Sequence, residues 1–292
     1  MILTPGSSPL SRNIEDYPEG IIIPIDKPYR WTSADVIRKV KFAAIRHFGK
    51  KNLKVGHAGT LDPLATGVLL VCIGKATKLA ETLQSHDKEY VAGITFGATT
   101  PSYDLEKEID RLFPYEHISA DSVREALPAF IGEQDQIAPL FSAKSVDGVR
   151  AYELARKLHK EGKTLDDAAE ELIRVSRINI SELELLDFAP KEWEGSFSKP
   201  ASSEADGKAA SASSRINVTD NSALGLPTAT VRMACSKGTY VRAFARDLGE
   251  ALGSGAHLDS LQRSRSGIFR VENALTVDQT LELLSPPQRA TH

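Results

Sequence analysis

Residues 54–67 of this 292-residue chain read KVGHAGTLDPLATG, and the six residues that follow read VLLVCI. The apolar run predicts a buried strand over 68–73. The preceding stretch holds one acid, Asp62, among three glycines, two threonines and a proline. Because glycine and proline fix an unusual backbone path, the stretch predicts a carboxylate held on a rigid loop at the edge of the strand. The alternative is an ordinary Asp-Pro turn.

The loop resembles the catalytic motif of the TruB family of tRNA pseudouridine synthases. Other segments match that family in the same order along the chain, from about residue 20 to about residue 270. They are Asp26-Lys27-Pro28 with Thr32-Ser33, Lys88-Glu89-Tyr90, Ser142-Ala143-Lys144 with Tyr152 to Arg156, Cys235 to Arg242, and Gly255 to Leu258. The resemblance implies the pseudouridine synthase fold and the isomerisation of uridine-55 in the T loop of tRNA to pseudouridine.

The resemblance also implies the site residues. Asp62 is the catalytic aspartate, and Arg242 matches the arginine that pairs with it. Tyr90 matches the tyrosine that stacks on the target base, and His57 matches the histidine that contacts RNA near the flipped nucleotide. Tyr240 and Leu261 match positions of the family's substrate pocket, one polar and one apolar. Lys27 matches a lysine of the family's Asp-Lys-Pro turn, where its role could also be structural.

The reaction breaks a C1′–N1 glycosidic bond, rotates the base and rejoins it through C5. Because it needs neither redox change nor net hydrolysis, we expect no cofactor and no metal. Asp62 could attack carbon or remove a ribose proton, and both roles remain open.

Hydrophobic periodicity and capping signals predict an α+β fold, a mixed and mostly antiparallel sheet decorated by helices. A capping box at Thr32–Asp35 opens a helix that Gly49 ends. A second helix is predicted over 239–252, with Arg242 and Arg246 one turn apart. Further strands are predicted over 20–25, 90–96 and 230–235.

The formal charge of −3 is unevenly distributed. Residues 27–55 carry nine Lys/Arg against the single acid Asp35, a net of +8, whereas residues 104–135 have a net of −6. A basic face on an otherwise acidic body suits RNA contact, and a merely solvated helix face is the alternative. Two cysteines, Cys72 and Cys235, lie in apolar runs and predict buried, reduced thiols.

We expect a flexible leader over 1–19, a catalytic domain over 20–285 and a C-terminal tail over 286–292. Residues 195–215 are rich in Ser and Ala and predict a flexible insertion. Only 22 residues follow Arg270, too few for the C-terminal PUA domain that many relatives carry. A cytoplasmic monomer that binds the T-stem and loop of tRNA is expected, with no membrane contact because no apolar run reaches 18 residues.

Three alternatives stay open. A guide-RNA-dependent synthase of the same superfamily would need a large C-terminal RNA-binding region. A non-catalytic RNA-folding chaperone could use the same basic face. A glycosidase would need a second flanking carboxylate, and the loop has none. The chain also departs from the family at Thr99 to Asp104, where many members carry a Thr-Asp-Thr-x-Asp run.

Overall fold

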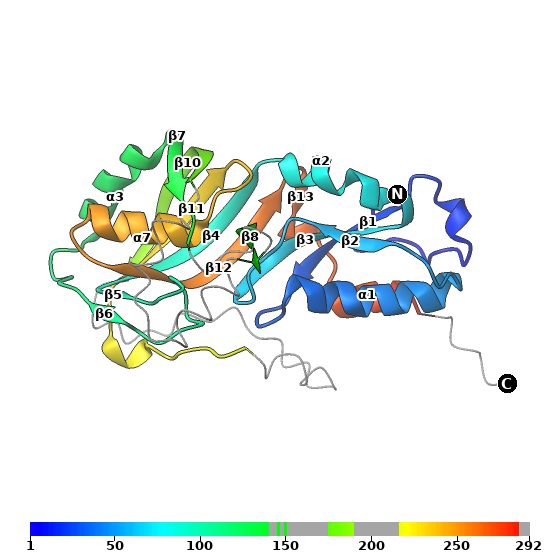
Figure 1. Cartoon of the computed structure of the whole chain (residues 1–292), viewed down its shortest axis with the longest axis horizontal. Helices are drawn as coiled ribbons and strands as arrows, with labels where there is room; N and C mark the ends of the chain where they lie inside the picture. The colour runs from blue at the N-terminus through cyan, green and yellow to red at the C-terminus, as the bar shows by residue number, and fades with distance from the viewer. Residues whose placement is uncertain (140–144, 147–148, 151–174, 190–215, 286–292) are drawn as a thin grey trace. The chain divides into compact units, whose positions relative to one another are not determined.

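The computed structural model describes residues 1–139, 145–146, 149–150, 175–189 and 216–285 (Figure 1). The family segments at 142–144 and 152–156, the predicted insertion and the predicted C-terminal tail lie outside these residues. The chain forms two compact units, each built from separate stretches of sequence. Of the described residues, unit 1 comprises 1–90, 216 and 261–285, and unit 2 comprises 91–139, 145–146, 149–150, 175–189 and 217–260.

The central strand of unit 1 is β3 (Ala65–Ile73), which is almost entirely buried. One of its edges pairs antiparallel with β1 (Ile21–Lys27) along the whole strand. β2 (Val55–Ala58) pairs antiparallel with the second half of β3, and β12 (Ala256–Ser266) pairs parallel with its first three residues. The first residues of β3 therefore lie between β1 and β12, directly after the Asp62 loop.

Helix α1 (Ser33–Phe48) begins and ends as the sequence predicts. Thr32 and Asp35 form the capping box, and Gly49 ends the helix in the left-handed conformation, with φ of 61°. The helix buries one apolar stripe in the core of unit 1, against β1 and β3. The remaining elements of unit 1 are η1 (Ile14–Asp16), η2 (Gly74–Leu79), α2 (Ala80–Ser85), β13 (Phe269–Arg270), η5 (Val271–Asn273) and α8 (Val277–Leu283).

The N-terminal residues differ from the flexible leader that we predicted. Leu3 is fully buried and Leu10 is nearly so, and both belong to the core of unit 1. Leu3 N–H donates to the Ile22 carbonyl at 3.0 Å, and the terminal amino group of Met1 donates to the Gly20 carbonyl at 2.9 Å. Two isolated leucines form no period, so their burial could not be inferred from the sequence pattern.

Unit 2 contains the strands in the order β4, β11, β10, β7, with the last two pairs antiparallel. These are β4 (Lys88–Phe96), β11 (Thr228–Cys235), β10 (Val175–Ala189) and β7 (Gly132–Ile137). Helix α7 (Val241–Ala251) buries Phe244, whose ring meets that of Phe130 edge-on at 5.4 Å. The smaller elements are β5 (Ala98–Thr99), β6 (Arg111–Leu112), α3 (Ala120–Ala126), η3 (Leu127–Phe130), β8 (Ser145–Val146), β9 (Val149–Arg150) and η4 (Ser222–Leu224).

This arrangement confirms the predicted α+β class, with a mainly antiparallel mixed sheet and helices. The predicted strands over 20–25, 68–73, 90–96 and 230–235 correspond to β1, β3, β4 and β11. Strands β4 and β12 each contribute residues to both units. Within the described part of the chain, every helix is too short or too polar to cross a membrane.

Candidate active site

The loop that carries Asp62 connects β2 to β3 in unit 1. Its tightest point is a turn in which the Ala65 N–H donates to the Asp62 carbonyl at 3.1 Å. Leu61 and Leu64 are buried, whereas Asp62 and Pro63 between them are only partly buried. The two leucines therefore anchor the turn, and Asp62 between them stays partly exposed.

Side chains from β1 and α1 hold the loop backbone. The hydroxyl of Ser33, the first residue of α1, donates to the Leu61 carbonyl at 3.1 Å and accepts from the Leu61 N–H at 3.0 Å. On the other side of the turn, an Asp26 carboxylate oxygen accepts from the Gly67 N–H at 3.0 Å. Both arms are thus fixed by hydrogen bonds to elements that the sequence places far from them.

Lys27 lies beneath the turn and is fully buried. Its ammonium donates to the carbonyls of Pro28 at 2.9 Å, Trp31 at 2.6 Å and Pro63 at 3.2 Å. Burial lowers its pKa to about 7, and the nearby Asp62 carboxylate opposes part of this shift. The position suits a residue that holds the loop, which is the structural role that the sequence left open.

Arg263 on β12 is a loop contact that sequence reasoning missed. It is 1% exposed, and its guanidinium donates to three carbonyls: Val68 at 2.7 Å, Gly59 at 3.2 Å and Thr60 at 3.4 Å. The stretch 261–266 is mostly polar, so it predicts a solvated strand. Only the parallel pairing of β12 with β3 shows that one of its arginines points into the protein.

Leu261 and Tyr90 both pack against the hydrophobic core of unit 1. Leu261 stands opposite Ala65 in the parallel pairing, and its carbonyl accepts from the Thr66 hydroxyl at 3.5 Å. Both side chains are partly buried and pack against the cluster that includes Leu61. An apolar and an aromatic side chain therefore share a core cluster with the loop.

His57 stands on β2, opposite Val71 of β3, and is partly buried. Burial lowers its pKa, and the Arg263 guanidinium lowers it further. The imidazole is therefore neutral at pH 7, and a neutral ring can both donate and accept a hydrogen bond.

Arg242 and Tyr240 belong to unit 2. Arg242 is buried; one of its guanidinium nitrogens donates to the Ser102 carbonyl at 3.1 Å, and its Nε lies 3.7 Å from an Asp104 carboxylate oxygen. The Tyr240 backbone, at the N-terminus of α7, exchanges two hydrogen bonds with the Gln136 side chain, at 2.8 and 3.1 Å. The pairing of Asp62 with Arg242 stays a prediction.

The segment that departs from the family, 99–104, is built against this arginine. Asp104 is buried, and its carboxylate also accepts from the Ser102 hydroxyl at 2.6 Å and the Glu106 N–H at 3.0 Å. Leu258 belongs to the family segment Gly255 to Leu258 at the start of β12, and its N–H donates to the Tyr103 carbonyl at 3.0 Å. The unusual sequence therefore still yields an ordered loop that contacts Arg242.

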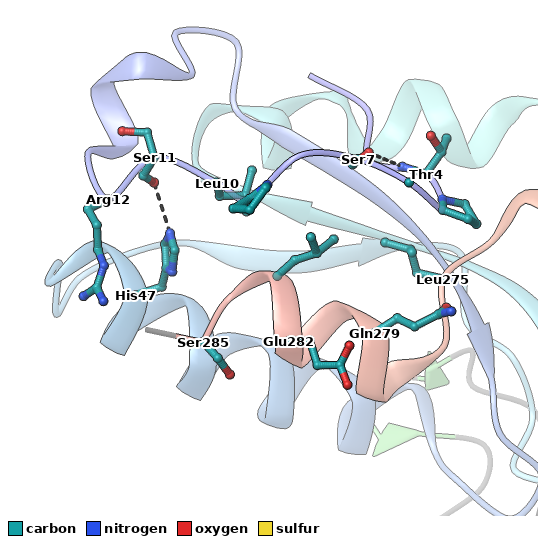
Figure 2. A pocket seen from close by; sticks show the side chains of 14 residues that line it. Thr4, Ser7, Leu10, Ser11, Arg12, His47, Leu275, Gln279, Glu282 and Ser285 are labelled. Carbon is teal, nitrogen blue, oxygen red and sulfur yellow. Dashed lines mark hydrogen bonds between the residues drawn. The ribbon is translucent and has the colours of Figure 1, made fainter. Parts of the chain in front are cut away.

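A cavity of about 620 Å³ lies in unit 1 between the N-terminal segment, the C-terminal end of α1 and α8 (Figure 2). His47 lies at one end, where its Nε2 is 3.0 Å from the Ser11 carbonyl oxygen. None of the seven predicted site residues lines this cavity. In the ranges that the structure covers, no group of three or more His, Cys, Asp or Glu side chains could hold a metal ion.

Comparison with known proteins finds two family matches. Residues 46–203 match the N-terminal domain of the TruB family of pseudouridylate synthases, and residues 242–286 match the C-terminal domain of tRNA pseudouridylate synthase B. The tRNA pseudouridine synthase B of Phocaeicola vulgatus is 46% identical over 92% of this chain and 95% of the relative. That of Bacteroides thetaiotaomicron is 45% identical over 89% of this chain and 91% of the relative.

Among solved structures, the fold is similar to that of a chain in a crystal structure of a Cbf5–Nop10–Gar1 complex. The TM-score is 0.57 with 24% sequence identity, covering 92% of this chain and 56% of the other. The present chain thus spans little more than half the length of that protein, and the likeness concerns the fold.

Proposed function

The chain belongs to the TruB family of pseudouridylate synthases, and from that membership we propose that it converts uridine-55 in the T loop of tRNA into pseudouridine. Three relatives named tRNA pseudouridine synthase B match this chain over 91–95% of their own length. We also propose that uridine-55 is the target and that the residues below have the roles given to them.

The observation that carries the proposal is the Asp62 loop. Asp62, partly exposed, stands on a turn whose backbone is bound by the buried side chains of Lys27, Ser33 and Arg263 from β1, α1 and β12. A rigid support of this kind keeps a reacting group in a productive geometry. We assign the carboxylate of Asp62 to the reaction at the sugar.

The target base must leave the stack of the T loop before it can react. Tyr90 is partly buried and packs against the core cluster of unit 1, and stacking of a base on an aromatic ring is worth about 1–3 kcal/mol. Extruding a base costs a few kcal/mol, so stacking on Tyr90 offsets much of that cost. Leu261 supplies an apolar wall, and the neutral His57 can hydrogen-bond to RNA beside the flipped nucleotide.

Arg242 is the predicted partner of Asp62, and Tyr240 is the predicted polar group of the substrate pocket. The guanidinium of Arg242 is planar and carries five N–H donors. One of its nitrogens donates to the Ser102 carbonyl, and its Nε lies 3.7 Å from an Asp104 carboxylate oxygen. The same geometry suits a second carboxylate. What supports this pairing is the resemblance of the sequence motifs around the two residues to those of the family.

The phosphates of the T-stem would bind the basic surface of α1 and the turn after it. Arg38 and Lys41 are exposed on the helix, and Lys51 and Lys54 are exposed on the turn. Lys50 is engaged with Glu15, with an N–O distance of 2.9 Å. Phosphate contacts of this kind position RNA and make affinity depend on salt. We further propose that the protein acts as a monomer in the cytoplasm.

The test is to incubate the purified protein with an unmodified tRNA transcript and with its isolated T-stem–loop hairpin, and then to map pseudouridine by chemical labelling. The proposal predicts one modified position, uridine-55, in both RNAs. An inert hairpin beside a modified full tRNA would show that recognition extends beyond the loop.

A further inference from the structure

Arg263 binds both arms of the Asp62 loop with one side chain. Its guanidinium donates to Gly59 and Thr60, which precede Asp62, and to Val68, which follows it. All three partners are backbone carbonyls, so the contacts depend on the path of the loop and not on the side chains along it. Arg263 therefore links the chain segment before Asp62 to the segment after it.

Strand pairing also holds the backbone of Arg263. It stands opposite Gly67 in the parallel pairing of β12 with β3. Gly67 has φ of 96°, and a Cβ built there would lie 2.3 Å from the Arg263 carbonyl oxygen. The two strands thus approach closely at this pair, which sets the point from which the guanidinium reaches the loop.

Lys27 completes the arrangement from β1. Its ammonium reaches Pro63, directly after Asp62, whereas Arg263 reaches the residues on either side of the turn. Two buried basic side chains thus lie close to the loop, and the charge of Arg263 helps to lower the pKa of Lys27. The hydrogen bonds from the side chains of Lys27 and Arg263 given above all go to backbone carbonyls.

We propose that Arg263 is a positioning residue for the isomerisation: by tying Gly59, Thr60 and Val68 together, it holds the Asp62 carboxylate at the distance from the ribose that the reaction needs. The inference rests on the proposed function of the loop. Arginine suits this role because a rigid planar fork can reach carbonyls on two chain segments, whereas an ammonium is a single point.

The test compares Arg263→Gln and Arg263→Lys with a matched control, Arg265→Gln. Arg265 lies two residues further along β12, is partly exposed and donates to the carbonyl of Gly267 in its own turn. For each protein the single-turnover rate at saturating hairpin RNA, the Kd for the same RNA and the melting temperature are measured. The fraction of folded protein at the assay temperature is taken from the melting curve.

Arg263→Gln should lower the single-turnover rate per folded molecule by about 100-fold, the effect of misplacing a reacting group by about 1 Å. The Kd should stay within about threefold, because the Arg263 side chain is buried and offers no surface for RNA to contact. Arg263→Lys should recover only part of the rate, and Arg265→Gln should match the wild type. If Arg263→Gln is unfolded at the assay temperature, the rate loss in folded Arg263→Lys decides the question.

A second readout reports the position of the guanidinium without turnover. Because Arg263 lowers the pKa of His57, Arg263→Gln should raise that pKa in an NMR titration of the imidazole, and Arg265→Gln should change it less. A rate per folded molecule equal to that of the wild type, or a loss confined to Kd, would overturn the proposal. If the wild type itself makes no pseudouridine, the proposed function fails, and the His57 titration still tests where Arg263 lies.

Discussion

The ammonium nitrogen of Lys27 lies 3.2 Å from the carbonyl oxygen of Pro63, the residue that follows Asp62. Two further carbonyls, of Pro28 and Trp31, complete its shell. An ammonium has three donors and can satisfy all three acceptors. The buried Lys27 side chain thus links the end of β1 to the turn that carries the candidate catalytic group.

Lys27→Met should lower the free energy of unfolding by about 3 kcal/mol, because one buried and two partly buried carbonyls lose their donor. The variant should also lose a pH effect. In the folded wild type the pKa of Lys27 falls from 10.5 to about 7, so between these values the unfolded chain binds more protons. Wild-type stability should therefore rise with pH over that window.

Urea titrations at several pH values between 7 and 10 measure this effect, with the exposed Lys75→Met as the control. The slope of stability against pH should be smaller in Lys27→Met than in Lys75→Met. Equal slopes in the two variants would show that Lys27 is not held in its folded environment with a lowered pKa.

Gly67→Ala should destabilise the protein strongly, by about 3 kcal/mol or more. The residue has a positive φ, and the added Cβ would lie 2.3 Å from the Arg263 carbonyl oxygen, so β3 and β12 must separate. Gly56 offers a control in the same motif, since nothing lies within 4 Å of its Cβ position. Chemical denaturation should show Gly56→Ala close to the wild type, and comparable losses in both variants would contradict the close approach of the strands.

Arg242→Lys should reduce turnover by about 100-fold, because lysine keeps the charge but loses the fork that orients carboxylates. It also loses the geometry that reaches Ser102 and Asp104 at once. Arg246→Lys, one turn further along α7, is the matched control. Single-turnover rates on hairpin RNA compare the two, and a near-normal rate for Arg242→Lys would mean that no orienting contact to a carboxylate is needed.

Lys51→Ala should flatten the salt dependence of RNA binding more than Lys50→Ala. Lys51 is exposed, whereas the Lys50 ammonium is 2.9 Å from a Glu15 carboxylate oxygen. Each lost phosphate contact reduces the slope of log K against log salt by about 0.7–0.9. Filter-binding titrations at several salt concentrations measure the slopes. An equal or larger change in Lys50→Ala would show that the Glu15 pair opens on RNA binding.

The sequence allowed the main elements of the fold to be predicted where periodicity and capping were strong. The capping box at Thr32, the ending glycine at Gly49 and the apolar run of β3 all lie where local chemistry places them. The burial of Leu3 could not be predicted, because it depends on the pairing of Leu3 with Ile22, 19 residues further along the chain. Contacts of this kind have no local signal.

The same limit applies to the candidate site. Asp62 stands out in the sequence because its loop is unusual in glycine and proline. Arg263 does not, because its role follows from a parallel strand pairing between segments nearly 200 residues apart. Lys27 could be noted in its turn, but its contact with Pro63 appears only once β1 and the loop are folded together.

The central claim is that Asp62 carries out the isomerisation of uridine-55. The most direct measurement maps pseudouridine in an unmodified T-stem–loop after incubation with wild-type protein or with Asp62→Asn, and records the Kd of each protein for the same RNA. Because the carboxylate acts in the reaction and the surrounding surface binds the RNA, the wild type should modify uridine-55. Asp62→Asn should give no product and a Kd within about threefold of the wild type. Residual activity above a few per cent in Asp62→Asn, or a wild-type product at another position, would contradict the claim.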